Sequence, residues 1–258
     1  MACLEFEPEC DGSTVVHVCA LSLRRDVEWP ARLGESLSPK ERARARRFLQ
    51  EADRRRFLLG RAVVRFLGGV HLGIDPANVR LDQTLTGKPY LANPLPIDRK
   101  PFEFNVAHSG DCVLIAWTEG RAVGVDVEAY ERRPATWFDD VSESVFSDGE
   151  RAALSASMPD DASGTFYRIW VRKEAVLKAE GCGVAGALRS FSVACPRGGR
   201  TEWFDEVDYP ESGRIWTVVD LTPAPGHLAA LALPAGSVLC LCRPQDFAAR
   251  VGAEQSRL

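Results

Sequence analysis

The sequence predicts an α+β fold made of helices and small antiparallel sheets, and three observations lead to this prediction. Short apolar segments joined by tight turns fill residues 102–128, which is the pattern of antiparallel strands. Two stretches, near residues 38–67 and 146–180, carry signals for the start and the end of helices. The sequence contains no glycine-rich phosphate loop of the nucleotide-binding kinds, which argues against a doubly wound parallel sheet.

The first elements in chain order are a strand and two helices. Residues 15–23 alternate weakly between apolar and polar positions, as strands do. The segment Ser38-Pro39-Lys40-Glu41 combines a capping serine, a proline for the first turn and a glutamate that can reach back to the cap. A helix is therefore expected from this segment to about Gln50. A second helix is expected over Ala52–Leu67, with Gly68-Gly69 ending it.

The middle and last thirds of the chain supply the remaining elements. Three strands joined by tight turns are expected to form an antiparallel meander, namely Phe104–Val106, Cys112–Trp117 and Ala122–Glu128. Helices are expected to open at Phe146–Glu150 and to run over Phe166–Glu180, with Gly181 as a stop. Further short strands are expected at Ser190–Ala194, Ile215–Val219, Leu228–Leu233 and, as a buried strand, Ser237–Cys242.

Composition places the chain among ordinary globular proteins. Its 258 residues are 45% hydrophobic and 26% charged. No stretch approaches the ~20 apolar residues that span a bilayer, and the acidic start lacks the basic flank of a signal peptide. The eight cysteines show no framework spacing and the four histidines are scattered, so we expect free thiols in a reducing cytoplasm and no zinc site. Neither a membrane nor a nucleic acid is expected as a partner.

Positive charge is concentrated in one segment. Residues 40–65 contain ten basic and three acidic side chains, a net +7 that leaves −11 on the rest of a chain whose total is −4. Such a concentration on an acidic protein indicates an anionic partner. The alternative is a solvated helix face.

Two acidic residues alternate with valines in Gly124-Val125-Asp126-Val127-Glu128. In a strand the valines would point into a core, and Asp126 and Glu128 would lie side by side on the other face. Two ionised carboxylates this close repel each other unless a cation lies between them or one is protonated. The oxygen ligands suit Mg²⁺. A solvated strand face that carries two acids is the alternative.

One face of the predicted helix over 166–180 carries Trp170, Glu174 and Lys178, which recur every four residues. An acid and a cation one helical turn apart suit a metal-bridged phosphate whose leaving oxygen needs its charge neutralised. A routine surface ion pair is the alternative. His108 lies in a predicted turn, from which it can reach a ligand, although a structural role is also open.

These motifs together resemble the Sfp-type (surfactin-synthetase-activating) phosphopantetheinyl transferases. The resemblance extends from about Ser38 to Val193. Its motifs appear in the order Ser38-Pro39-x-Glu41 followed by basic residues, Gly87-Lys88-Pro89, Phe104-Asn105-Val106-Ala107-His108-Ser109-Gly110, Gly124-Val125-Asp126-Val127-Glu128, and Trp170-x-x-Lys173-Glu174-Ala175-x-x-Lys178-x-x-Gly181.

The resemblance implies two similar α+β halves, each a small antiparallel sheet packed with helices, with a ligand cleft between them. An N-terminal half, residues 1–123, would supply nucleotide contacts, and a C-terminal half, residues 124–258, would supply the metal ligands and the catalytic helix. The implied reaction transfers 4′-phosphopantetheine from coenzyme A to a serine of an acyl or peptidyl carrier protein, and it releases 3′,5′-ADP. Carriers of fatty-acid, polyketide and nonribosomal-peptide synthesis are equally compatible. A monomer is expected.

The resemblance also implies roles for individual residues. Asp126, Glu128 and Glu174 would bind Mg²⁺, with Glu174 also the base for the carrier serine and Lys178 the cation beside the departing nucleotide. The positions implied to contact coenzyme A are Arg44, Gly87, Lys88, Pro89, Ala107 and His108.

Four features depart from the family pattern. Ala107 stands where a serine is usual, so one hydrogen bond to phosphate is missing. Val127 supplies no metal ligand. The residues before about Thr14 have no counterpart, and those of Arg132–Val145, where the family meets its carrier, do not match closely.

Two other functions remain open from the residues themselves. The chain could be a coenzyme A-binding protein without catalysis, or a Mg²⁺-dependent phosphohydrolase that acts on a nucleotide. Loss of one of the three acids or of the lysine would favour a binding protein without catalysis, but all four residues are present, namely Asp126, Glu128, Glu174 and Lys178. Phosphate release without a carrier would favour the second.

Overall fold

The computed structural model describes residues 13–24, 31–131, 133, 135–158, 161–183, 188–193 and 204–243. Its helices are α1 (Ala31–Glu35), α2 (Pro39–Ala45), α3 (Glu51–Leu72), α4 (Asp139–Val145), α5 (Asp148–Ser155) and α6 (Ala162–Glu180), with 3₁₀ turns η1 (Pro76–Asn78) and η2 (Ala135–Phe138). Its strands are β1 (Val15–Ser22), β2 (Leu81–Gln83), β3 (Pro89–Leu91), β4 (Phe102–Ser109), β5 (Cys112–Glu119), β6 (Gly124–Ala129), β7 (Phe204–Tyr209), β8 (Arg214–Leu221), β9 (His227–Pro234) and β10 (Val238–Cys242). Within these ranges no helix has the length and apolarity needed to cross a bilayer.

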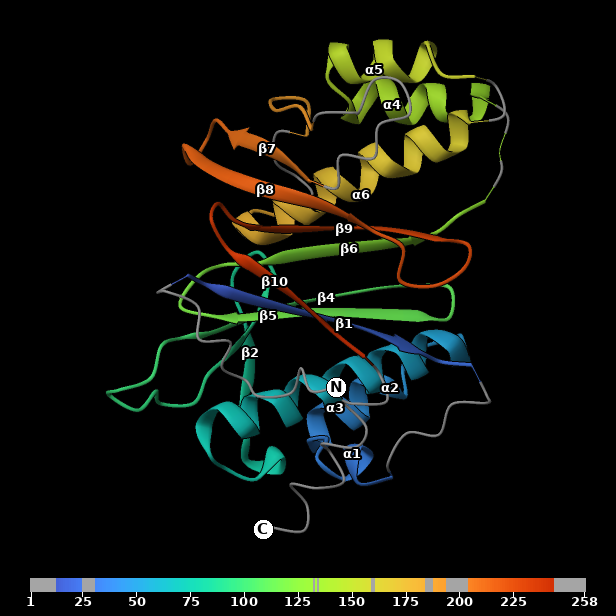
Figure 1. Cartoon of the computed structure of the whole chain (residues 1–258). Coiled ribbons are helices and arrows are strands. Elements are labelled where there is room, and N and C mark those ends of the chain that lie inside the picture. Colours follow the sequence, from blue (N-terminus) through green and yellow to red (C-terminus); the bar gives the residue numbers. More distant parts are fainter. Residues whose placement is uncertain are drawn as a thin grey trace.

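Two four-stranded sheets lie face to face, and helices cover the outer face of each (Figure 1). The sheet orders are β10-β1-β5-β4 and β6-β9-β8-β7. Alternate residues of β1 and β5 meet alternate residues of β6 and β9 in an apolar layer between the sheets. Helix α3 packs on one outer face and α6 on the other.

The two halves repeat one plan, which confirms the predicted α+β class with two similar halves. In the first half β1 pairs with β5, which pairs with β4; in the second, β6 pairs with β9, which pairs with β8. In each half the long helix follows the first strand of the sheet. The exception is β10, which comes from the end of the described chain and pairs in parallel with β1 of the first sheet.

Cap residues set the helix ends much as predicted. Ser38 and Glu41 form a reciprocal capping box at α2, and Ser147 and Glu150 form a second one at α5. Gly181 ends α6 in the left-handed conformation, at φ 75°.

Three helix bounds were predicted wrongly. One of them is the start of α6, which begins at Ala162 and not at Phe166. Helix α3 continues through Gly68-Gly69 and ends at Leu72. These glycines are needed for close packing, since a Cβ on Gly69 would lie 2.8 Å from the carbonyl oxygen of Ile74. Helix α2 ends at Ala45, before the expected Gln50.

Three strand predictions also need correction. The third strand of the expected meander, β6, leaves β5 and begins the second sheet beside β9. Strand β10 is an edge strand whose Leu241 is 65% exposed, so it is not buried. Residues 190–193 form a turn and coil where a strand was expected, and Ala194 lies outside the described residues.

Gly124 fixes the distance between β6 and α6. A Cβ at this position would lie 2.0 Å from the carbonyl oxygen of Ala175 and 2.3 Å from the amide nitrogen of Ala179. Both contacts are with helix backbone, which cannot move aside as a side chain can. Glycine therefore lets β6 lie directly against the helix that carries Glu174 and Lys178.

We expect Gly124→Ala to lower the free energy of unfolding by about 3 kcal/mol, because overpacking typically costs ~1–3 kcal/mol. Urea unfolding followed by circular dichroism measures this change. The matched control is Gly149→Ala on α5, where an added Cβ meets nothing within 4 Å. The control should leave stability unchanged or raise it by up to ~1 kcal/mol. Equal effects of the two substitutions would contradict the close approach.

Candidate functional site

Side chains from both halves line a cavity of about 280 Å³ between them. Strand β4 of the first half contributes one wall, and β6 and α6 of the second half contribute the others. The lining residues are Val106, Ala107, His108, Asp126, Val127, Glu128, Trp170, Glu174 and Lys178. The structure thus brings together the strand acids, the acid and lysine of α6, and His108, which lie far apart in the sequence. His108 was predicted to lie in a turn, but it belongs to β4, which continues to Ser109 and pairs with β5.

Strand alternation directs the acids of β6 into this cavity. Val123, Val125 and Val127 are at most 1% exposed in the layer between the sheets, as predicted. Asp126 and Glu128 point the other way and line the cavity. The register of β6 with β9 holds this arrangement, since Asp126 lies opposite Ala230.

The cavity buries a cluster of like charges. Asp126 and Glu174 are 5% and 6% exposed. Lys178 donates a 2.5 Å hydrogen bond to Asp126 Oδ1. Burial raises the pKa of Asp126 to about 6 against the opposing effect of Lys178, and the charges of Glu128 and Glu174 raise it further. Burial also raises the pKa of Glu174. The site holds more negative charge than Lys178 offsets.

Two carboxylate oxygens are suited to bind a cation. Among the described residues, Asp126 Oδ2 and Glu174 Oε1 are buried and have no hydrogen-bond partner. A buried unpaired carboxylate oxygen is costly, and native proteins retain such atoms where a ligand or ion completes them. Three carboxylates with two open oxygens form the hard-oxygen donor set that Mg²⁺ prefers. The residues present therefore fit the metal.

The buried acid predicts how stability depends on pH when a chelator removes divalent cations. Asp126 binds its proton more tightly in the folded protein, where its pKa is about 6, than in the unfolded chain, where it is about 3.9. The free energy of unfolding should therefore fall by roughly 3 kcal/mol as pH rises from below 4 to above 6, because each unit of difference between the folded and unfolded pKa corresponds to about 1.36 kcal/mol. Urea unfolding in EDTA at several pH values measures it, and Asp126→Asn should lose this component. The same pH dependence in both proteins would contradict the raised pKa.

Two polar residues of β4, to which the sequence motifs gave no role, hold the strand acids in place. Ser109 Oγ donates a 2.8 Å hydrogen bond to Glu128 Oε2 and accepts one from the Ala129 amide. Asn105 Oδ1 accepts a 3.2 Å hydrogen bond from the Val125 amide. Both residues belong to the Phe104–Gly110 motif, but the contact of β4 with β6 of the other half is visible only in the structure.

The Gly87-Lys88-Pro89 turn contacts the second half outside the acidic cavity. It joins β2 to β3, with Gly87 at φ 86°. Lys88 Nζ donates a 3.1 Å hydrogen bond to the Ala179 carbonyl, and Thr86 Oγ1 donates one of 2.6 Å to the Gly181 carbonyl. Burial lowers the pKa of Lys88. The turn therefore contacts the C-terminal end of α6, and its residues are not among those lining the acidic cavity.

The basic segment is not a single solvated helix face. Arg65 is buried and pairs with Glu41 at 2.7 Å, and Arg61 pairs with the same glutamate at 3.2 Å. Arg44 lies with its guanidinium 5.2 Å from the centroid of the Phe57 ring, outside the acidic cavity. Arg56, to which the sequence motifs gave no role, donates to the Gly110 carbonyl in the turn after β4.

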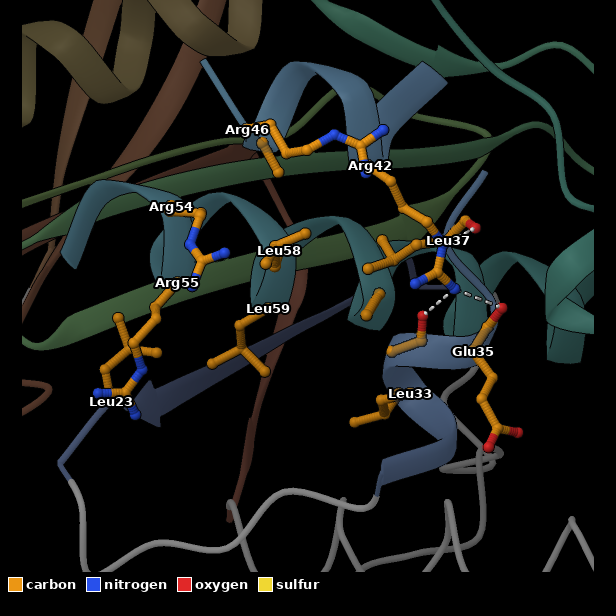
Figure 2. Close-up of a pocket in the computed structure, with 13 residues that line it drawn as sticks. Leu23, Leu33, Glu35, Leu37, Arg42, Arg46, Arg54, Arg55, Leu58 and Leu59 are labelled. Atoms are coloured by element: carbon orange, nitrogen blue, oxygen red, sulfur yellow. Dashed lines mark hydrogen bonds between the residues drawn. The ribbon is translucent and has the colours of Figure 1, made fainter. Parts of the chain in front are cut away.

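Other arginines of the segment surround a second cavity, of about 580 Å³, in the helical layer of the first half (Figure 2). Its apolar wall includes Leu33, Leu58 and Leu59. Arg42 is tied down by hydrogen bonds to the carbonyls of residues 34, 35 and 37. Arg46, Arg54 and Arg55 also line this cavity, which shares no residue with the acidic one.

The segment where a carrier was expected to dock lies partly outside the described residues, at Arg132 and Pro134. Within it, Trp137 is 50% exposed, whereas Phe138 is fully buried against Phe166. Only the first of these two aromatic residues is therefore available on the surface.

Two family profiles match the chain. The profile described as "4′-phosphopantetheinyl transferase, N-terminal" matches residues 26–120, and that described as "4′-phosphopantetheinyl transferase superfamily" matches residues 122–231. The junction of the two matches falls just before β6.

Individual relatives are similar over much of their length. A 4′-phosphopantetheinyl transferase of Nostoc sp., HetI, is 30% identical over 86% of this chain and 88% of its own. The transferase Sfp of Bacillus subtilis is 29% identical over 76% of this chain and 81% of its own. A phosphopantetheinyl transferase of Thraustochytrium sp. is 37% identical over 63% of this chain, and the matched part spans 58% of that longer protein.

Proposed function

From the premise that this chain belongs to the Sfp-type 4′-phosphopantetheinyl transferase family, we propose that it moves 4′-phosphopantetheine from coenzyme A to a serine of an acyl or peptidyl carrier protein, with Mg²⁺ as cofactor. One observation carries the proposal. Three carboxylates and an ammonium group from β6 and α6 line one cavity between the halves, and two of the carboxylate oxygens are buried without a partner among the described residues.

Asp126, Glu128 and Glu174 would hold the metal. Bound Mg²⁺ would offset the charge of the coenzyme A diphosphate and of the transferring phosphoryl group. Ser109 keeps Glu128 oriented toward the cavity through its 2.8 Å hydrogen bond. The close approach of β6 to α6 at Gly124 brings the helix acid to the strand acids.

Glu174 would accept the proton of the carrier serine, directly or through a water molecule. Serine is a poor nucleophile at its free pKa and needs such a base. Burial raises the pKa of Glu174, which makes its carboxylate a stronger base. The serine Oγ–P bond forms as the bond between phosphorus and the bridging oxygen of 3′,5′-ADP breaks. Lys178, 30% exposed at the cavity, would then offset the charge on that oxygen.

The nucleotide part of coenzyme A would contact the first half, residues 1–123. Ala107 and His108 line the cavity beside the acids, which supports their proposed contacts. Gly87, Lys88 and Pro89 lie at the end of α6, and Arg44 lies over Phe57; their contacts with coenzyme A remain predictions. Residues 124–258 would supply the metal ligands and the catalytic helix. We propose that the enzyme acts as a cytoplasmic monomer.

The proposal is tested by incubating the protein with coenzyme A, Mg²⁺ and a panel of apo carrier proteins. We expect the mass of at least one carrier to rise by one phosphopantetheine group, with release of 3′,5′-ADP. EDTA, or replacement of the carrier serine by alanine, should abolish the gain.

Other outcomes would contradict the proposal. Binding of coenzyme A with no modification of any carrier would indicate a binding protein without catalysis. Release of free phosphate without a carrier would indicate a phosphohydrolase.

A further inference from the structure

Strand β10 places two cysteines beside a histidine of β1. Cys240 and Cys242 are two residues apart on one strand, so their side chains point to the same face of the sheet. Strand β10 lies beside β1 (Figure 1), and their parallel pairing sets His17 directly opposite Cys240. One ligand atom from each of the three residues lies within 4.8 Å of the others. The scattered histidines of the sequence gave no sign of this cluster, because it depends on the register of two strands from opposite ends of the chain.

Two thiols and an imidazole form a donor set that zinc prefers. Zinc–sulfur bonds of ~2.3 Å and zinc–nitrogen bonds of ~2.0 Å place sulfur and nitrogen about 3.5 Å apart around a tetrahedral ion. The distance from Cys242 Sγ to His17 Nδ1 is 3.9 Å. This pair would need to move by a few tenths of an ångström, and the other two pairs, which lie within 4.8 Å, by up to about 1.3 Å to reach tetrahedral ligand spacing. Three protein ligands leave one position for water or another group.

The surroundings hold the histidine and leave the cysteines accessible. His17 is 8% exposed, and its ring stacks on Trp117 with centroids 5.2 Å apart and planes 14° from parallel. Cys240 and Cys242 are half-buried on an edge strand, so an ion from solvent can reach them. The cluster shares no residue with the acidic cavity.

We propose that His17, Cys240 and Cys242 bind Zn²⁺ or another thiophilic d¹⁰ cation, which would cross-link β10 to β1. The ligands differ in kind from the oxygens of the acidic cavity, so the two sites would select different metals. The bound ion would fasten the end of the described chain to the first sheet. Because it binds only the folded arrangement, it would stabilise the fold in proportion to the logarithm of its concentration above the dissociation constant.

Cobalt titration of the full chain, reduced and stripped of metal, tests the proposal. Co²⁺ should produce thiolate-to-cobalt charge-transfer absorption in the near ultraviolet and the visible bands of a tetrahedral site, and Zn²⁺ should remove both. An excess of Mg²⁺ should change neither. Cys240→Ser and Cys242→Ser should each weaken cobalt binding about tenfold or more. The matched control is Cys182→Ser, a half-buried thiol of the other half, which should leave the spectrum unchanged.

Thermal unfolding gives a second readout that is independent of transferase activity. Zn²⁺ should raise the unfolding temperature of the wild type and of Cys182→Ser, but not that of the Cys240→Ser, Cys242→Ser double variant. The proposal is overturned if excess cobalt gives no thiolate band with the reduced wild type, or if the double variant keeps the band. It is also overturned if zinc stabilises the double variant as much as the wild type.

Discussion

Replacing Glu174 with glutamine is expected to lower kcat for phosphopantetheine transfer by about three orders of magnitude. The substitution keeps the shape of the side chain but removes both the proton acceptor and one of three carboxylate charges around the cavity. A general base contributes ~10²–10⁴-fold, and a proposed metal ligand would be lost at the same time. Mass spectrometry of a carrier protein over time, with saturating coenzyme A and Mg²⁺, measures the rate.

The matched control for this variant is Glu206→Gln. Glu206 is an exposed glutamate of β7, outside the acidic cavity, so the control should keep the wild-type rate. Circular dichroism should show that both variants are folded. A fall of less than about tenfold in the Glu174 variant would remove this residue from the roles of base and metal ligand.

Replacing Glu150 with glutamine is expected to lower the free energy of unfolding by about 3–5 kcal/mol, the usual cost of breaking a buried ion pair from one side. Lys173 is 0% exposed and donates a 2.9 Å hydrogen bond to Glu150 Oε1. Glu150 also accepts hydrogen bonds from the amides of Ser147 and Val193, each at 2.8 Å. The carboxylate therefore joins α5, α6 and the segment after α6, and its loss leaves the charge of Lys173 buried without its partner.

Urea unfolding measures this loss, and a neighbouring ion pair supplies the control. Asp148 lies in the same helix and pairs with Arg189 at 3.4 Å, with both side chains more than half exposed. Asp148→Asn should cost less than about 1 kcal/mol. A double substitution of Glu150 and Lys173 by methionine should restore part of the stability lost in the single variant. A cost for Glu150→Gln as small as that of Asp148→Asn would contradict the buried pair.

Local signals in the sequence predicted the elements whose ends depend on neighbouring residues. Capping serines, their partner glutamates and Gly181 set helix ends through contacts within a few residues. The same holds for β6, where alternation alone separates the valines of the core from the acids of the cavity.

Predictions failed where distant segments decide the outcome. Gly68-Gly69 was predicted to end the helix, yet both glycines lie within α3, where a Cβ on Gly68 would lie 3.0 Å from the Leu91 side chain of β3. Strand β6 follows β5 closely in the chain but pairs with β9, about a hundred residues later. It does so because each sheet packs against its own long helix, and β6 and β9 both contact α6.

The candidate site was predictable as a set of residues but not as an arrangement. Asp126, Glu128, Glu174, Lys178 and His108 all line one cavity, as the motifs suggested. The supporting contacts of Asn105 and Ser109 could not be predicted, since they cross from β4 to β6 between the halves. The place of Arg44 over Phe57 and of Lys88 at the end of α6 likewise depends on packing between helices and a hairpin.

The central claim is that three carboxylates meet around one divalent cation that also holds the diphosphate of coenzyme A. Crystals grown with Mn²⁺ and coenzyme A test it most directly, because manganese can be located by its anomalous scattering. We expect one strong anomalous peak within bonding distance of Asp126, Glu128 and Glu174, with the diphosphate oxygens completing the coordination of the metal. Coenzyme A bound with no metal at these carboxylates, or a manganese peak elsewhere beside the diphosphate, would contradict it.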